Sequence, residues 1–194
     1  MGVALNLPIA ITLVRIALIP ILVLVFYLPV PWSPAAAALV FALGAVSDWL
    51  DGYLARRLSQ TSPFGAFLDP VADKLMVAVA LVLLVQADPT PWLAVPAAVI
   101  VGREIVISAL REWMAEVGKR AHVAVSLVGK FKTGVQMAAL LCMLYRQPLG
   151  GLPVYETGFA LLYVAAGLTL WSMVMYLRAA LAALRAGARG TASG

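Results

Sequence analysis

The sequence contains little charge and almost none of the side chains that form disulfides or histidine metal sites. Only 12% of its 194 residues are charged and 63% are hydrophobic, whereas soluble domains carry roughly 25% charged residues. The one cysteine, Cys142, excludes a disulfide within the chain. The one histidine, His122, has no ligand partner near it. These shortages exclude a soluble globular domain, and we expect no nucleic-acid partner.

Long apolar runs take the place of the missing charge. A membrane-spanning helix needs about 20 mostly apolar residues, and a mean hydropathy of +0.98 leaves room for little else. We predict an all-α polytopic membrane protein with one domain over residues 1–194 and a flexible tail at residues 185–194. No Ala-x-Ala-like cleavage site follows the first run, so we expect it to remain as a helix. The six predicted transmembrane helices cover residues 8–28, 35–58, 64–87, 91–117, 123–145 and 155–184.

The basic residues between these runs predict the topology. Proline and glycine cluster in the connections that follow the odd-numbered runs. The opposite side of the membrane carries Arg56 and Arg57, Lys119 and Arg120, and the arginines near the C-terminal end. Because positively charged loops stay in the cytoplasm, we predict that both termini are cytoplasmic.

Four aspartates interrupt the second and third apolar runs: Asp48, Asp51, Asp69 and Asp73. A charged side chain inside the membrane costs about 2.5–3.5 kcal/mol on insertion scales and therefore indicates a functional site. Spacings of three and four place each pair on one face of its helix, and the short connection at residues 59–63 makes the helices antiparallel neighbours. All four carboxylates can meet in the cytoplasmic half of the membrane. Since they would repel one another, we predict that they hold a divalent cation.

Two other interpretations of these acids remain. Lys74 or Arg56 could pair with an aspartate, but one ion pair accounts for only one of the four acids. An ion-transport pathway also uses acids within membrane helices. Such a pathway favours broken helices that meet at the membrane midplane, whereas these aspartates lie toward one end of their helices.

The complete pattern resembles a known family motif. It reads Asp48-x2-Asp51-Gly52-x2-Ala55-Arg56-x8-Gly65-x3-Asp69-x3-Asp73, and it resembles the motif of the CDP-alcohol phosphatidyltransferase family at every fixed position. Further stretches resemble one branch of that family, including Asn6-x-Pro8, Thr12-x2-Arg15, Arg103-Glu104 and Gly129-Lys130. Ile9 departs from the pattern, because many relatives carry asparagine there. The likeness extends over nearly the whole chain.

The resemblance implies a metal-dependent transferase of phospholipid biosynthesis in the bacterial inner (cytoplasmic) membrane. Its donor would be CDP-diacylglycerol, and the active site would face the cytoplasm. Asp48, Asp51, Asp69 and Asp73 would hold Mg²⁺ or Mn²⁺, as two ions, and Asp73 would also be the catalytic base. A homodimer is implied as well. The residues expected to bind the donor are Asp48, Asp51, Gly52, Ala55, Arg56, Gly65 and Asp69.

Basic residues in the fourth and fifth runs predict the second substrate. Arg103 and Arg111 are eight residues apart and share a helix face. Arg103 lies deep in an apolar run, and we expect the adjacent Glu104 to point elsewhere, so a phosphate group would be its partner. We therefore predict glycerol 3-phosphate as the acceptor, with inositol phosphate as an alternative. The residues predicted to bind it are Arg103, Arg111, Lys119, Arg120 and Lys130.

Some basic residues have a second interpretation. Lys119, Arg120 and Lys132 could simply contact lipid headgroups on the cytoplasmic side, as flanking cations often do. Arg15 lies inside the first run and leaves two possibilities open. It either extends to the lipid headgroups or reaches an anionic ligand beside the aspartates.

Overall fold

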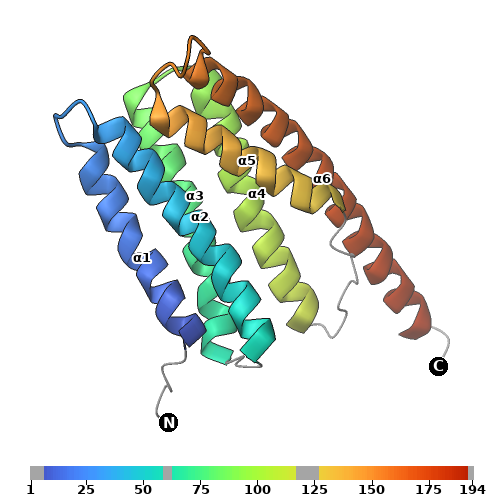
Figure 1. Ribbon diagram of the computed structural model, residues 1–194. Helices are drawn as coiled ribbons and strands as arrows, with labels where there is room; N and C mark the ends of the chain where they lie inside the picture. Colours follow the sequence, from blue (N-terminus) through green and yellow to red (C-terminus); the bar gives the residue numbers. More distant parts are fainter. Residues whose placement is uncertain (1–6, 59–62, 117–126, 192–194) are drawn as a thin grey trace.

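The chain folds into six α-helices. A computed structural model describes residues 7–58, 63–116 and 127–191 (Figure 1). Within these ranges the polypeptide is helical apart from short connections and one isolated β-bridge between Leu149 and Leu152. The helices are α1 (Leu7–Phe26), α2 (Ser33–Leu58), α3 (Pro63–Ala87), α4 (Pro91–Glu116), α5 (Leu127–Tyr145) and α6 (Val154–Thr191).

The predicted all-α architecture is confirmed, and the helices indicate an integral membrane protein. In the described ranges, four helices are long and apolar enough to cross a membrane: α1, α3, α4 and α6. The other two contain shorter apolar stretches, Ser33–Asp48 and Phe131–Tyr145. Six helices are found, as many as predicted, and within the described residues four of them are candidate membrane spans.

The largest difference from the predicted boundaries is at the end of the chain. Helix α6 continues to Thr191, through most of the segment that we predicted to be a flexible tail. Residues 185–191 contain two alanines and two arginines, which favour a helix, and two glycines, which do not. The helix therefore continues past the end of the apolar run with a sequence of mixed helix propensity.

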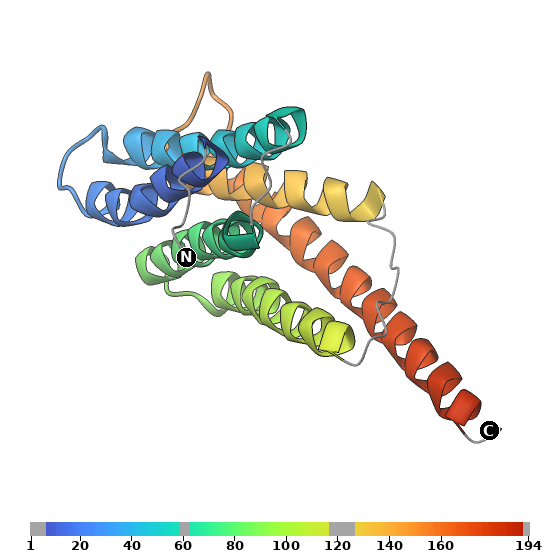
Figure 2. The same ribbon diagram turned by 90° about the horizontal axis from the view of Figure 1, so that it is seen from below.

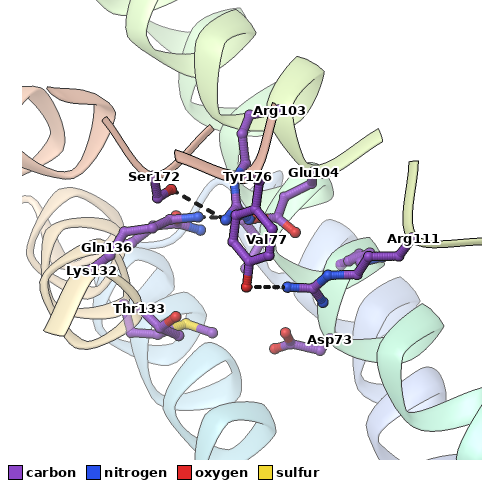
Figure 3. A pocket seen from close by; sticks show the side chains of 12 residues that line it. Asp73, Val77, Arg103, Glu104, Arg111, Lys132, Thr133, Gln136, Ser172 and Tyr176 are labelled. Carbon is purple, nitrogen blue, oxygen red and sulfur yellow. Dashed lines mark hydrogen bonds and ion pairs between the residues drawn. The ribbon is translucent and has the colours of Figure 1, made fainter. Parts of the chain in front are cut away.

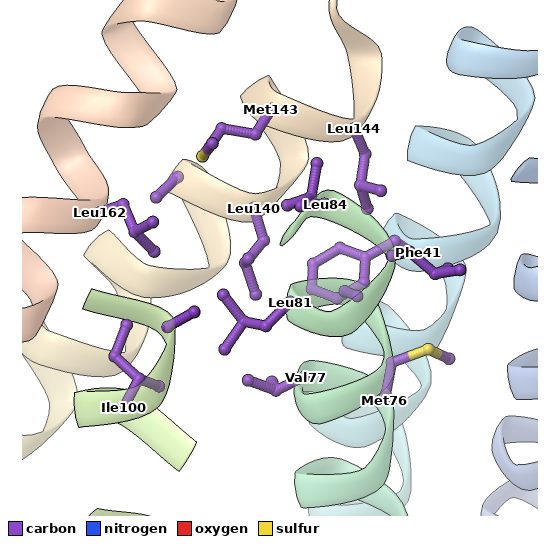
Figure 4. Close-up of a cluster of buried hydrophobic side chains, with 14 of the residues drawn as sticks. Phe41, Met76, Val77, Leu81, Leu84, Ile100, Leu140, Met143, Leu144 and Leu162 are labelled. Carbon is purple, nitrogen blue, oxygen red and sulfur yellow. The ribbon is translucent and has the colours of Figure 1, made fainter. Parts of the chain in front are cut away.

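Helix α3 lies at the centre of the bundle, in contact with α1, α2, α4 and α5. Its buried face repeats every four residues at Ala72, Met76, Ala80 and Leu84, the spacing of one side of a helix. Figure 4 shows side chains from the other helices packed around this face. They include Phe41 of α2, Ile100 of α4, Leu140 of α5 and Leu162 of α6, each fully buried.

The helices alternate in direction, so their connections divide between two ends of the bundle. Helix α1 begins and α6 ends at the same end (Figure 1). Viewed from below, α1 and α2 pack side by side on one flank, while α6 packs against α4 and α5 on the other (Figure 2). At the opposite end, hydrogen bonds tie neighbouring segments together, including Tyr155 Oη to Asp88 Oδ2 at 2.8 Å and Tyr163 Oη to the Trp92 carbonyl at 2.8 Å. The aspartate motif lies at the end where α2 finishes and α3 starts.

Candidate active site

A polar cavity opens between α3, α4, α5 and α6. Its volume is about 260 Å³, and Asp73 of the aspartate motif lies in its wall. The remaining walls carry cations and polar groups, several of which Figure 3 shows pointing toward one another. The lining residues are Asp73, Lys74, Val77, Arg103, Glu104, Arg111, Lys132, Thr133, Gln136, Met137, Ser172 and Tyr176.

Arg15 of α1 links the aspartates of α2 and α3. Its side chain is only 1% exposed, and its Nη1 lies 3.0 Å from Asp48 Oδ1. Arg15 also lines a small cavity of about 10 Å³ together with Asp73 and Gly44. Because the guanidinium is buried beside the acids, the structure excludes the interpretation in which Arg15 extends to the lipid headgroups. The other interpretation, a place in the acid pocket, agrees with this position.

The described carboxylates suit a hard divalent cation. The Asp48 side chain is 47% exposed although one of its oxygens contacts Arg15, and Asp73 opens into the polar cavity. Both offer carboxylate oxygens, the ligands that magnesium prefers. The side chains of Asp51 and Asp69 lie outside the described residues. Among those that are described, no three histidine, cysteine, aspartate or glutamate side chains gather around one point. The four-aspartate metal site therefore remains a prediction.

Glu104 stands between two cations in the cavity, contrary to our expectation that it would point away from Arg103. Its Oε1 accepts a hydrogen bond from Arg103 Nη1 at 2.5 Å and another from Lys132 Nζ at 2.9 Å. Lys132 is 4% exposed and the Arg103 side chain 10%. Buried cations are costly unless they are paired. Consecutive residues of a helix point in directions about 100° apart. The side chains of Arg103 and Glu104 are nevertheless long enough to turn into the same cavity and form an ion pair there.

Two residues of α6, not identified from the sequence, hold the arginines. Arg111 Nη2 donates to Tyr176 Oη at 2.8 Å, and Arg103 Nη2 donates to Ser172 Oγ at 3.3 Å. The Tyr176 ring also lies 5.0 Å from the Arg111 guanidinium carbon and 5.9 Å from that of Arg103. Ser172 and Tyr176 are four residues apart and therefore share a helix face. That spacing was visible in the sequence, but the partners of the two side chains were not.

Two buried polar atoms in this cavity have no hydrogen-bond partner among the described residues. They are Nε of Arg103 and Oε1 of Gln136. Buried polar groups are nearly always paired in folded proteins, so each such atom needs an explanation. One is a donor and the other is an acceptor. A ligand with both an anionic group and a hydroxyl could satisfy the two.

Comparison with known proteins identifies the family. The family model described as CDP-alcohol phosphatidyltransferase matches residues 5–182. The chain belongs to this family. It is also 58% identical over 179 residues to the CDP-diacylglycerol–glycerol-3-phosphate 3-phosphatidyltransferase of Escherichia coli (strain K12), a match that covers 92% of this chain and 97% of the relative. The proteins of the same name from Escherichia coli O157:H7 and Shigella flexneri serotype 5b match with the same identity and coverage.

The structure describes the positions of only some residues of the family motif and of the predicted acceptor site. Gly65 is buried at the start of α3. Lys74 Nζ donates to Ser108 Oγ of α4. The structure does not describe the surroundings of Gly52 or the side chains of Ala55, Arg56 and Lys130. Lys119 and Arg120 lie outside the described residues altogether. The roles predicted for these residues remain predictions. Of the residues predicted to bind the acceptor, Arg103 and Arg111 do line one cavity together with Asp73. Lys132, for which the sequence also allowed a contact with lipid headgroups, lines it too.

Proposed function

We propose that the protein transfers the phosphatidyl group of CDP-diacylglycerol to glycerol 3-phosphate, releasing CMP and forming phosphatidylglycerophosphate. The names and 58% identity of its relatives, which match over 97% of their length, support both substrates. The single observation in the structure that carries the proposal is the cavity that contains Asp73 together with Arg103, Arg111 and Lys132. A catalytic carboxylate and an anion-binding cluster in one chamber suit a phosphorylated acceptor.

The charge of the cavity supports a phosphate at its cationic wall. Arg103, Arg111 and Lys132 contribute three positive charges, and Glu104 offsets one of them. The net charge of about +2 matches a phosphate monoester, which carries about −1.5 to −2 at neutral pH. Arginine adds geometric selectivity because its planar fork can donate two parallel hydrogen bonds to a phosphate. An acceptor with no net charge, such as serine, would leave this excess positive charge uncompensated.

Asp73 is the proposed catalytic base. It lies on the wall of the cavity that would hold the acceptor, so a hydroxyl of the bound acceptor can face its carboxylate. Asp73 takes the proton of that hydroxyl while the oxygen forms a bond to the phosphatidyl phosphorus. The bond from that phosphorus to the bridging pyrophosphate oxygen breaks, and CMP leaves with the bonding electrons. Positioned proton transfer of this kind contributes about 10²–10⁴-fold to a rate.

We propose that Asp48, Asp51, Asp69 and Asp73 hold Mg²⁺ or Mn²⁺, as two ions. Such ions supply positive charge that neutralises pyrophosphate oxygens and stabilises the leaving group. Arg15 would keep one oxygen of Asp48 occupied at 3.0 Å, which fixes the orientation of that carboxylate. The motif residues Gly52, Ala55, Arg56 and Gly65 would contact the nucleotide of the donor.

We also propose an inner-membrane protein whose active site faces the cytoplasm and which assembles as a homodimer. Positive residues flank the end of the bundle that carries the aspartate motif, as the positive-inside rule expects for the cytoplasmic side. Membrane lipids would surround the exposed apolar side chains, such as Leu24, Val82 and Trp171, which are 69%, 65% and 66% exposed. The acyl chains of the donor could then remain in the bilayer during the reaction.

Purified protein assayed with CDP-diacylglycerol and a panel of polyol phosphates tests this proposal. We expect CMP release with glycerol 3-phosphate, loss of activity with a chelator and recovery on adding Mg²⁺ or Mn²⁺. The Asp73→Asn variant should lose about 10²–10⁴-fold in rate. Asp88→Asn, at the opposite end where Asp88 contacts Tyr155, is the matched control and should stay active.

Four outcomes would contradict the proposal in different ways. A wild-type rate in Asp73→Asn would refute the role of Asp73 as catalytic base. Full activity in the presence of chelator would refute the metal dependence. Transfer to inositol phosphate in place of glycerol 3-phosphate would change the acceptor only. Divalent-ion transport into vesicles without any lipid donor would instead favour the transporter interpretation.

A further inference from the structure

Gln136 of α5 is a buried amide in the cavity wall that the proposed reaction does not yet use. The residue is 5% exposed and lines the same cavity as Asp73, Arg103 and Lys132. It is four residues after Lys132, so both lie on the face of α5 that is turned toward the cavity. Its Oε1 has no hydrogen-bond partner among the described residues. Gln136 is thus an uncharged amide in a cavity whose other polar side chains are mostly ionic.

The chemistry of an amide oxygen limits what can satisfy it. It accepts hydrogen bonds and donates none, and leaving such an atom buried and unpaired costs about 1–3 kcal/mol. A phosphate dianion has no proton to donate, so it cannot serve as the partner. A hydroxyl group can. The cations of the cavity bind the phosphate of the acceptor, and Gln136 is suited to another part of the same molecule.

We propose that Gln136 accepts a hydrogen bond from the hydroxyl of the acceptor that does not react, and that this contact determines specificity. The inference rests on the proposed function. Glycerol 3-phosphate carries two hydroxyls besides its phosphate, so one can face Asp73 while the other faces Gln136. The phosphate, the reacting hydroxyl and the retained hydroxyl would then contact three different partners in the cavity: the cations, Asp73 and Gln136. Recognition at three points orients the acceptor for attack.

A substrate that lacks only the retained hydroxyl tests this contact. The compound 3-hydroxypropyl phosphate keeps a terminal hydroxyl and the phosphate but has no hydroxyl on its middle carbon. We expect the wild-type enzyme to favour glycerol 3-phosphate over it by about 10–100-fold in kcat/KM, because a site built to bind a hydroxyl discriminates against an analogue without one. In Gln136→Met, a side chain of similar size without the amide, this preference should fall to about threefold or less.

Two further variants separate recognition from a merely structural role. Gln136→Glu keeps an oxygen acceptor and should retain the preference for the hydroxyl, even though its added negative charge lowers the affinity for both phosphates. Gln86→Met makes the same substitution at the end of α3 remote from Asp73, where Gln86 contacts Tyr27. This control should leave the preference for glycerol 3-phosphate unchanged.

The possible failures can be told apart. A Gln136→Met enzyme that keeps the wild-type preference, or loses activity equally with both compounds, refutes the role of Gln136 and leaves the proposed function standing. If Gln136→Met does not fold, loss of the preference in Gln136→Glu refutes the role. Wild-type enzyme that transfers to neither compound refutes the proposed function itself.

Discussion

Replacing Arg103 with methionine should weaken acceptor binding far more than donor binding. Arg103 donates to Glu104 and Ser172 through its two terminal nitrogens, while its buried Nε has no partner among the described residues. The guanidinium is therefore held in place while its buried Nε–H is still available to a ligand. The variant removes that donor and also lowers the net charge of the cavity wall from about +2 to about +1.

The size of the effect follows from the charge of the lost contact. A hydrogen bond to a charged group contributes about 1.5–3 kcal/mol, and each 1.4 kcal/mol is tenfold in binding. We expect the KM for glycerol 3-phosphate to rise about 10–150-fold in Arg103→Met. Arg103→Lys keeps the charge but loses the planar fork, so its KM should lie between those of the wild-type and methionine enzymes.

Steady-state kinetics with each substrate varied in turn measure this prediction. The KM for CDP-diacylglycerol should change less than about twofold, because the donor is assigned to the motif on α2 and α3. Arg146→Met is the matched control, since Arg146 lies 5.0 Å from the Phe26 ring at the opposite end of the bundle. An acceptor KM within threefold of the wild-type value, or an equal rise in the donor KM, would refute the assignment of Arg103 to the acceptor phosphate.

Two further predictions concern α6. Tyr176→Phe removes the 2.8 Å hydrogen bond to Arg111 but keeps the ring, so the KM for the acceptor should rise a few-fold. Tyr176→Leu also loses the cation–π contact with Arg111, and because Arg111 is exposed this contact contributes about 0.5–1 kcal/mol. The acceptor KM of Tyr176→Leu should therefore be about 2–5-fold above that of Tyr176→Phe. Tyr163→Phe is the control, and an unchanged acceptor KM in Tyr176→Leu would contradict the role. Gly158→Ala places a Cβ 2.8 Å from Cys142 Cβ and 2.9 Å from the Ala139 carbonyl, so it should lower the free energy of unfolding by about 1–3 kcal/mol. Gly167→Ala meets nothing within 4 Å and should raise it by about 0.5–1 kcal/mol; thermal unfolding in detergent compares the two, and equal midpoints would show that α5 and α6 do not pack closely at Gly158.

Most helix boundaries could be predicted because they depend on neighbouring residues. The third helix was predicted over residues 64–87 and is observed over Pro63–Ala87, since proline and charged residues end its apolar run. Helix α6 extends to Thr191, beyond the membrane span predicted at residues 155–184, because hydrophobicity locates the membrane but says little about where a helix stops outside it. Residues that share a face, such as Arg103 and Arg111, were also predictable from helical spacing.

The contacts of the cavity depended on packing between distant segments. Glu104 was expected to point away from Arg103, yet it lies between Arg103 and Lys132, which is 28 residues away on α5. Arg15 could not be assigned until α1 was seen to bury it against Asp48. Gln136 was overlooked because one amide in an apolar helix has no significance until the cavity beside it is known.

By itself, the sequence determined that this chain forms membrane helices and carries four acids near one end of two adjacent helices. These properties follow from the length of apolar runs and from spacings of three and four residues, which are local. Only the tertiary structure decided that Tyr176 meets Arg111, 65 residues earlier in the chain, and that α4 and α5 bring cations into the cavity that Asp73 lines. Such contacts arise from the way whole helices pack, and no short stretch of sequence contains that information.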